Sequence, residues 1–290
     1  MSTRFDDDTA LTPASDGSVT ATVSGDWTAG RGPHGGYIAA MILRALMDTV
    51  ADPARQPRSL TVHYARAPEP GPVTLHTVLH RAGRSVSTLS ARLAQANRVV
   101  AVALATFSVA WSGPEIDDST LPEVSPPDSD RVSPEVLRRN SPPFARHLVM
   151  QPRLGAAPFS GSHEAMEIGG WIGLAEPRTV DALSLALYSD AWFSPPYVRL
   201  ERFVASPTLD LTVHFRAPLP RSDPQELCLA RFTSTVVRDG FFEEDGVIWA
   251  PDGTVLAQSS SRCSSGCEGG RREGGHFLSQ SGGVGVSTSV

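Results

Sequence analysis

One segment of the chain occurs twice in nearly the same form, and this repetition constrains the fold more than any other feature of the sequence. The run LTVHYARAP spans residues 60–68, and LTVHFRAP spans residues 211–218. In each half, a strand-like run and an apolar, helix-like run precede the repeated segment, and further strand-like runs follow it. The same segment at the same place in the same order of elements indicates an internal duplication of about half of the chain.

The first half predicts one buried helix and a series of antiparallel strands. Residues 37–50 are almost wholly apolar, which is typical of a helix that is covered on every side. Before this helix, residues 18–23 alternate in the manner of a strand. No helical segment separates the later strand-like runs, so we expect them to form an antiparallel meander. These runs are residues 59–66, 73–80, 85–95 and 99–109.

The second half predicts the same elements in the same order. Residues 165–173 are strand-like, and residues 179–192 are expected to form a helix with Thr179 as its N-cap. The strands that follow are predicted at residues 208–217, 226–238, 246–250 and 254–260.

Changes in composition suggest where the domains end. Residues 111–145 are rich in proline, serine and aspartate, which is typical of an exposed linker. Residues 264–290 are mostly glycine, serine and arginine without periodicity, so we expect a disordered tail there. An N-terminal domain would then cover residues 1–110, and a C-terminal domain residues 146–263.

Composition and charge exclude several classes of protein. The 290 residues carry a net charge of −6 and no basic stripe, which argues against a nucleic-acid partner. No apolar run is long enough for a membrane span, and the acidic start does not resemble a signal peptide, so a cytoplasmic location is expected. Three cysteines do not make a disulfide framework. All 25 basic residues are arginine, which excludes mechanisms that need a lysine.

A glycine-rich turn precedes the first predicted helix and allows three interpretations. Gly30, Gly32 and Gly35 fit the G-x-G-x-x-G pattern of a dinucleotide site. Pro33 inside the loop and the consecutive strands after the helix argue against that site. Alternatively, free N–H groups at Gly35 and Gly36 could bind a developing oxyanion. A turn with positive φ and a surface histidine at position 34 would give the same pattern.

Asp190 is the most informative single residue. On a helix over residues 179–192, it continues an apolar stripe formed by Leu183, Ala186 and Leu187. It also lies near the C-terminal end, where the helix dipole disfavours negative charge. Both effects disfavour the charged carboxylate and suit it to proton transfer. A solvated aspartate at a fraying helix end is the alternative.

Other catalytic and metal-binding patterns are absent from the sequence. No G-x-S-x-G or H-E-x-x-H motif occurs. Cys263, Cys267 and His276 do not have the spacing of a zinc site, so we expect neither a metal nor a cofactor. His63 and His214, in the repeated segment, are expected to be structural and to point to the opposite face from their valine neighbours.

The motifs His34-Gly35-Gly36, Tyr188-Ser189-Asp190 and Thr208-Leu209-Asp210, in this order, resemble those of the acyl-CoA thioesterase II family. The resemblance covers roughly residues 18–262. It implies an α+β double hotdog, in which two antiparallel sheets are each wrapped on one buried helix.

The resemblance also implies hydrolysis of acyl-CoA thioesters by water, without metal or covalent intermediate. In the family an aspartate, a threonine and a glutamine hold the water, and backbone N–H groups polarise the carbonyl. Asp190 and Thr208 match the first two, and His34, Gly35 and Gly36 would form the oxyanion and substrate site. Ser261 stands where the glutamine is expected. Gln258 lies three residues earlier, so it faces the other side of a regular strand.

Three readings of function follow from this resemblance. The first is a thioesterase that acts on fatty acyl-CoA or a related thioester. The second, favoured by the missing glutamine, is a hotdog protein that binds acyl thioesters without hydrolysing them. The third is a hotdog hydratase, which would need a paired aspartate and histidine, and no histidine stands near Asp190 in the sequence. An acyl-CoA is the expected partner, and the sequence leaves open whether the chain forms a homo-oligomer.

Overall fold

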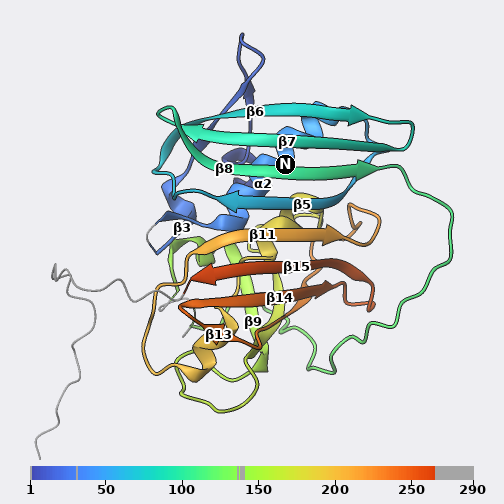
Figure 1. Cartoon of the computed structure of the whole chain (residues 1–290). Coiled ribbons are helices and arrows are strands. Elements are labelled where there is room, and N and C mark those ends of the chain that lie inside the picture. Colours follow the sequence, from blue (N-terminus) through green and yellow to red (C-terminus); the bar gives the residue numbers. More distant parts are fainter. Residues whose placement is uncertain (1, 31, 136, 138–140, 265–290) are drawn as a thin grey trace, which may run out of the picture.

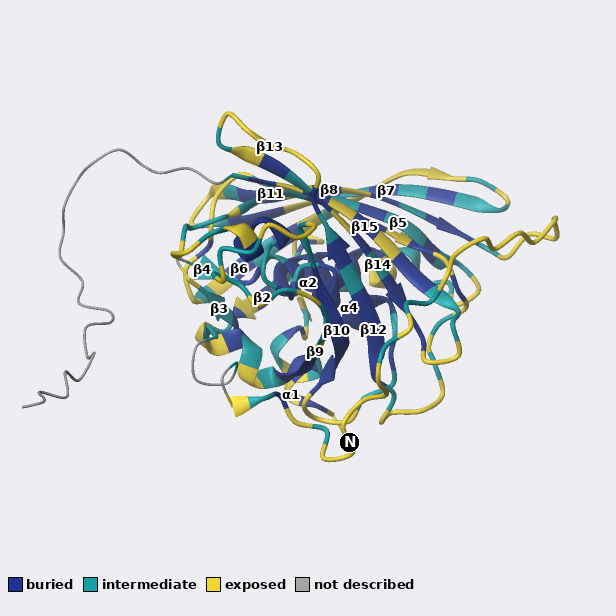
Figure 2. Ribbon diagram, turned by 90° about the horizontal axis from the view of Figure 1, so that it is seen from below, coloured by how far each residue is buried: buried dark blue, intermediate teal, exposed yellow. Residues whose placement is uncertain are grey.

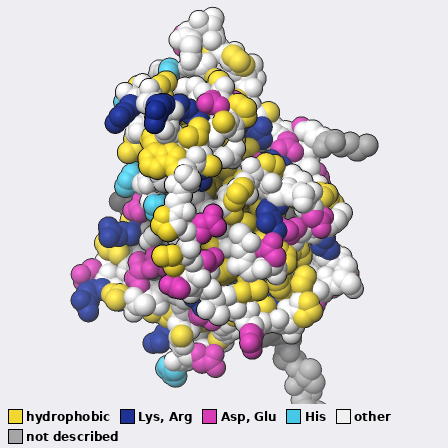
Figure 3. Space-filling model, turned by 90° about the vertical axis from the view of Figure 1, so that its right-hand side faces the viewer, with side chains coloured by type: hydrophobic (Ala, Val, Ile, Leu, Met, Phe, Trp, Pro, Cys, Tyr) yellow, Lys and Arg dark blue, Asp and Glu magenta, His cyan; other side chains and the backbone are white. Residues whose placement is uncertain are grey.

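The structure is a computed structural model of the whole chain, and it describes residues 2–30, 32–135, 137 and 141–264. The predicted tail therefore lies outside the described residues, apart from Ser264. Within the described residues, no helix has the length and apolar character needed to cross a membrane. Acidic, basic and apolar side chains are interspersed on the face shown in Figure 3.

The first half contains the predicted helix and all of the predicted strands. Helix α2 (Gly35–Val50) is buried over most of its surface, and it ends at Ala51, which has a left-handed conformation. The main strands are β2 (Val19–Val23), β5 (Gln56–Tyr64), β6 (Gly71–Ala82), β7 (Val86–Gln95) and β8 (Arg98–Ser108). Short elements surround them: α1 (Arg4–Asp8), β1 (Thr12–Pro13), the 3-10 turn η1 (Gly25–Trp27), β3 (Thr28–Ala29) and β4 (Gly32–Pro33).

The second half repeats this order with an additional edge strand that the sequence did not reveal. Strand β9 (Leu148–Gly155) follows the 3-10 turn η2 (Pro143–His147) and pairs with β10 (Glu167–Leu174). The later elements are α4 (Ala182–Tyr188), η3 (Pro195–Arg199), β11 (Thr208–Phe215), β12 (Cys228–Thr233), β13 (Val237–Arg238), β14 (Phe241–Trp249) and β15 (Val255–Ser264).

Helix α4 is shorter than the sequence predicts, and its N-cap is Asp181 instead of Thr179. The Asp181 carboxylate accepts from the Ser184 N–H at 2.9 Å, and the Ser184 hydroxyl lies 2.9 Å from the Asp181 N–H. This reciprocal capping box satisfies two otherwise free groups, so the helix begins there. The helix ends at Tyr188 with Ser189 as its C-cap, so Asp190 lies two residues beyond the last helical residue.

The prediction of two separate sheets is wrong, because the two halves share one sheet (Figure 1). Strand β5 of the first half pairs antiparallel with β11 of the second, so the polar edge of each half is covered by the other. The strand order is β1-β2-β6-β7-β8-β5-β11-β15-β14-β12-β10-β9, and β13 pairs with β14.

The repeated segment lies at the centre of this shared sheet. Thr61 and Thr212, which occupy the same position in the two copies, pair directly across the β5–β11 seam. Their hydroxyl oxygens are 3.0 Å apart. The sequence repeat is therefore paired with itself, and a local two-fold relationship runs through this point.

The two helices lie side by side against the inner face of the curved sheet (Figure 2). Their buried side chains join the inward-facing residues of both halves in one continuous hydrophobic core. His63 and His214 are exposed on the outer face. Because both helices pack into the same core, the beginning of α2 comes close to the end of α4.

Candidate active site

The candidate site lies where the beginning of α2 meets the end of α4, so both halves of the chain contribute to it. A Cβ atom at Gly36 would lie 2.6 Å from the Leu187 carbonyl oxygen and 2.9 Å from that of Ala186. Only a glycine allows this approach, because a real Cβ atom would overlap with the α4 backbone. The glycine-rich turn thus serves close packing between the two helices.

The Asp190 carboxylate is held by groups from two different elements. The Gly36 N–H donates to its Oδ2 at 2.8 Å, and the Thr208 hydroxyl donates to its Oδ1 at 2.9 Å. The side chain is 11% exposed. The sequence places Asp190 at the unfavourable end of α4, but the structure adds the positive end of α2, which stabilises a negative charge.

His34 caps α2 and binds the backbone of Asp190. Its Nδ1 accepts from the Tyr37 N–H at 3.2 Å, so Nε2 carries the proton and donates to the Asp190 carbonyl oxygen at 2.7 Å. The ring stacks on Phe144 with 4.2 Å between centroids. Burial lowers the pKa of His34, and the nearby Asp190 opposes this effect. His34 is therefore a neutral, buried residue instead of a surface histidine.

The same histidine lies close to the Asp190 side chain. Its Nε2 is 3.6 Å from Oδ2, so the structure brings together an Asp–His pair that the sequence does not show. The two residues come from different halves of the chain, which is why their sequence separation hides the pair. Both ring nitrogens already bind backbone groups, so His34 is not free to exchange a proton with a ligand.

Gly35 is enclosed between Asp190 and Tyr64. A Cβ atom at Gly35 would lie 2.7 Å from Oδ2 of Asp190, and the Tyr64 hydroxyl donates to the Gly35 carbonyl oxygen at 2.8 Å. Burial raises the pKa of Tyr64, and the charge of Asp190 adds to the effect, so the phenol stays protonated. In the described part of the chain, the Gly35 N–H has no hydrogen-bond partner.

Strand β15 brings Ser261 and Cys263 to this side of the sheet and turns Gln258 away from it. Cys263 pairs with Thr208, and its Sγ lies 3.9 Å from the Thr208 hydroxyl and 3.9 Å from the Ser261 hydroxyl. The Gln258 Oε1 accepts from Arg216 Nε at 2.8 Å on the exposed face. The structure therefore brings together five of the predicted site residues, namely His34, Gly35, Gly36, Asp190 and Thr208. Ser261 lies two residues before Cys263 on the same face of β15, and Gln258 lies on the opposite, exposed face.

Sequence reasoning missed Cys263 as a neighbour of Thr208, although a signal existed. Residues 261 and 263 share one face of a strand, so an inward-facing Ser261 implies an inward-facing Cys263. Burial raises the pKa of the Cys263 thiol, which keeps it protonated. Within the described residues, no three His, Cys, Asp or Glu side chains are placed to hold a metal, and Cys267 and His276 lie outside those residues.

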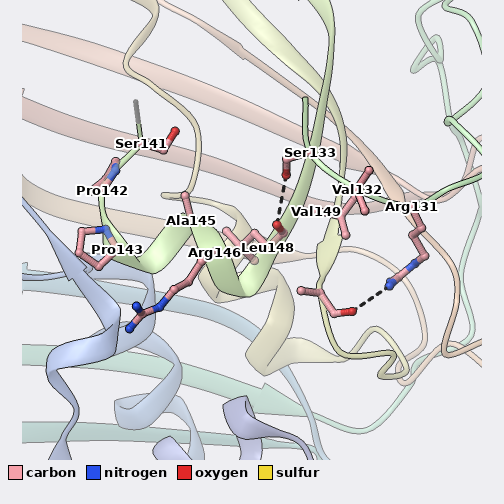
Figure 4. A pocket seen from close by; sticks show the side chains of 11 residues that line it. Arg131, Val132, Ser133, Ser141, Pro142, Pro143, Ala145, Arg146, Leu148 and Val149 are labelled. Atoms are coloured by element: carbon pink, nitrogen blue, oxygen red, sulfur yellow. Dashed lines mark hydrogen bonds between the residues drawn. The ribbon is translucent and has the colours of Figure 1, made fainter. Parts of the chain in front are cut away.

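A cavity of about 410 Å³ lies next to η2 (Figure 4). Arg131 and Arg146 lie among its lining residues, and Arg146 forms an ion pair with Asp26. Phe144, which belongs to the same turn, packs on His34. None of the site residues predicted from the sequence lines this cavity, so it is separate from the group around Asp190.

Comparisons with known proteins agree with this architecture. A protein of Mycobacterium tuberculosis without assigned function is 23% identical, over 80% of this chain and 86% of its own length. A conserved hot dog protein of unknown function from Alicyclobacillus acidocaldarius superposes with a TM-score of 0.80 at 26% identity, covering 92% of this chain and 99% of its own. Acyl-CoA thioesterase II TesB2 from Mycobacterium marinum superposes with a TM-score of 0.72 at 20% identity, covering 90% and 97%.

Two family models cover most of the chain. The model of the acyl-CoA thioesterase N-terminal domain matches residues 23–108, and that of the acyl-CoA thioesterase C-terminal domain matches residues 119–261. The matched ranges correspond to the two halves of the shared sheet, which meet at β5 and β11. The chain therefore belongs to the acyl-CoA thioesterase family and has its hotdog fold.

Proposed function

We propose that the chain hydrolyses acyl-CoA thioesters to a free acid and CoA. The observation that carries this proposal is the Asp190 carboxylate, which is held by the Gly36 N–H and the Thr208 hydroxyl at the positive end of a helix. A carboxylate fixed in this way is ready to orient a water molecule and accept its proton. Membership of the acyl-CoA thioesterase family supports the thioester as the bond that is attacked.

In the proposed reaction, Asp190 is the general base. Water attacks the thioester carbon while its proton passes to the carboxylate, and the carbonyl oxygen becomes an oxyanion. The tetrahedral intermediate then collapses, the carbon–sulfur bond breaks, and the departing thiolate takes the proton back from Asp190. The acid and CoA leave, and the carboxylate returns to its starting state.

The two glycines have different roles in this proposal. Gly36 already donates its N–H to Asp190, so it positions the base. The Gly35 N–H has no partner in the described part of the chain, and it lies at the positive end of α2. It is therefore the first candidate to bind the oxyanion, and Gly36 would assist only when its bond to Asp190 lengthens.

The remaining residues shape the site. Thr208 holds one carboxylate oxygen of Asp190 and would also contact the water. Ser261 is the candidate third polar residue, since Gln258 faces the opposite side of β15. The apolar faces of α2 and α4 and the inner face of the sheet would line the acyl pocket.

Binding without turnover is the second candidate function. It is favoured by one observation, namely that Ser261 stands where the glutamine is expected while the Gln258 side chain is bonded to Arg216 on the exposed face. A hydratase is less favoured, because the ring nitrogens of His34 are occupied by Tyr37 and Asp190 backbone groups.

A hydrolysis screen tests the proposal. Purified protein is mixed with acyl-CoAs of increasing chain length, and the released CoA is measured with a thiol reagent. Asp190→Asn keeps the size of the side chain but removes the base, so we expect a loss of about 10²- to 10⁴-fold in kcat with normal melting. Asp245→Asn, on the exposed face of β14, is the matched control. Wild-type turnover in Asp190→Asn would contradict the proposed base, and binding without any hydrolysis would favour the second function.

A further inference from the structure

Three polar side chains form a row on the inner face of the sheet, next to Asp190. Ser261 of β15 pairs with Glu244 of β14. Thr233, the last residue of β12, pairs with Asp245, and Ser234 follows it beyond the end of the strand, in the direction of Glu244. All three are buried, with exposed fractions of 3% for Ser261, 6% for Glu244 and 6% for Ser234. The row runs from β15 across β14 to the residue that follows β12.

The row has almost no hydrogen-bond partners inside the protein. The Ser234 hydroxyl is fully enclosed and has none. Within the described residues the Glu244 carboxyl makes no hydrogen bond either, but its oxygens are not fully enclosed. Ser261 makes only a long contact of 3.9 Å to the Cys263 sulfur. Buried polar groups in proteins are almost always paired, because an unpaired one is costly. An apolar side chain at position 244 would avoid the cost of burying a carboxyl group. The presence of Glu244 therefore indicates that this position binds a ligand.

The position of the row relates it to the reaction centre. Thr208 and Cys263 form the pair beside Asp190, and Leu211 and Ser261 form the next inward-facing pair on the same two strands. Two residues along a strand correspond to about 6.8 Å. An acyl chain that extends from a thioester at Asp190 along the inner face would reach the row within a few carbon atoms.

Glu244 is suited to bind an uncharged oxygen group. Burial, and then the negative charge of Asp190, raise the pKa of Glu244 well above its usual range. A protonated carboxyl offers one O–H donor and one carbonyl acceptor. Each serine hydroxyl adds one further donor and one further acceptor. This set of groups matches a hydroxyl or keto group better than a cation, which would need a charged carboxylate.

We propose that Ser234, Glu244 and Ser261 form a polar subsite that binds a hydroxyl or keto group on the acyl chain of the substrate. The proposal rests on the proposed function, because it places the thioester at Asp190. The preferred substrates would then be acyl-CoAs that carry a hydroxyl or keto group on the acyl chain, instead of unsubstituted fatty acyl-CoAs. A site that is built to hydrogen-bond a substrate hydroxyl discriminates strongly against an analogue that lacks it.

Matched substrates test the subsite. The probes are hexanoyl-CoA and its 3-hydroxy and 5-hydroxy derivatives, for which kcat/KM is measured with wild type, Glu244→Leu, Glu244→Gln and Ser234→Ala. We expect wild type to prefer one hydroxylated probe by about tenfold or more. Glu244→Leu should lose or reverse this preference. Glu244→Gln, which keeps a donor and an acceptor, should retain most of it, and Ser234→Ala should weaken it. Ser260→Ala, which removes a hydroxyl from the exposed face of β15, should leave the preference unchanged.

A binding measurement separates this proposal from the proposed function. The Kd of each probe is determined by calorimetry with Asp190→Asn, so that discrimination is seen even if no acyl-CoA is hydrolysed. Melting curves check that Glu244→Leu folds, and Ser234→Ala provides a second variant that removes only a hydroxyl. Equal Kd values for hexanoyl-CoA and both hydroxylated probes would overturn the subsite and mean that the row holds only water. Tighter binding of an amino-substituted hexanoyl-CoA would also overturn it, because Glu244 would then act as a charged carboxylate.

Discussion

The side chain of Asp190, from the second half of the chain, accepts a hydrogen bond from the main-chain N–H of Gly36, from the first half, at 2.8 Å. This bond joins the end of α4 to the beginning of α2, so the group around Asp190 exists only when the two halves are packed together. The repeat also shows that the first half lacks one member of this group. Leu60 corresponds to Leu211, so Pro57 occupies the position of Thr208 and has no hydroxyl to donate.

Gly36→Ala should destabilise the protein, because the added methyl group would meet the carbonyl oxygens of Leu187 and Ala186. Forcing an extra carbon into a packed contact usually lowers the free energy of unfolding by ~1–3 kcal/mol. We expect the melting temperature to fall by several degrees and hydrolysis to fall with it. Gly113→Ala, where the new Cβ atom would have nothing within 4 Å, is the control. Equal melting temperatures for the two variants would show that the helices do not need this close approach.

Thr208→Val should lower kcat while the fold is kept, because valine has the shape of threonine without the hydroxyl that binds Asp190. A hydrogen bond to a charged group contributes ~1.5–3 kcal/mol, which corresponds to a rate loss of about 10- to 100-fold. Thr208→Ser restores the hydroxyl and should recover most of the rate. Similar losses in both variants would mean that the methyl group of Thr208 matters and the hydroxyl does not.

The sequence predicts the individual helices and strands, but it does not predict how the strands are arranged into sheets. The strand and helix patterns of both halves, and the LTVH repeat, identify the elements, because burial leaves a periodic trace in each. The pairing of β5 with β11 leaves no such trace, since Thr61 and Thr212 look like ordinary strand residues. A strand at the edge of one half and a strand at the seam between halves show the same alternation of apolar and polar residues. The sequence pattern therefore cannot distinguish one shared sheet from two separate sheets.

The candidate site shows a similar division. Asp190, Thr208 and the glycines could be identified because each lies in a local motif. The contact between His34 and Asp190 could not, because the two residues are far apart in the chain and only the packing of α2 on α4 brings them together. Glu244 was missed because the strand that contains it was predicted to begin at residue 246, whereas β14 begins at Phe241.

His34 should make the stability of the protein depend on pH. Burial lowers its pKa in the fold below the ordinary value of 6.5, so the unfolded chain binds a proton at a pH where the folded chain does not. The contribution of neutral His34 is therefore present above about pH 6.5 and is lost as the pH falls, by at most ~1.4 kcal/mol per pH unit. In His34→Gln, which cannot be protonated, the decrease in melting temperature between pH 7.5 and 5.5 should be smaller. The same decrease in both proteins would show that His34 does not carry the effect.

Cys263→Ser should retain most of the hydrolytic activity, although Cys263 lies directly opposite Thr208. Burial raises the pKa of this thiol, and a protonated thiol is a poor nucleophile, so the reaction should proceed through water held by Asp190. Gln258→Ala, on the exposed face and bonded to Arg216, is the control on the same strand and should also retain activity. The measurement is kcat on the best acyl-CoA of the screen. A loss of more than 100-fold in kcat for Cys263→Ser, with normal melting, would indicate a covalent thioester on the cysteine. The same loss in kcat for Gln258→Ala would indicate that β15 changes its register when substrate binds.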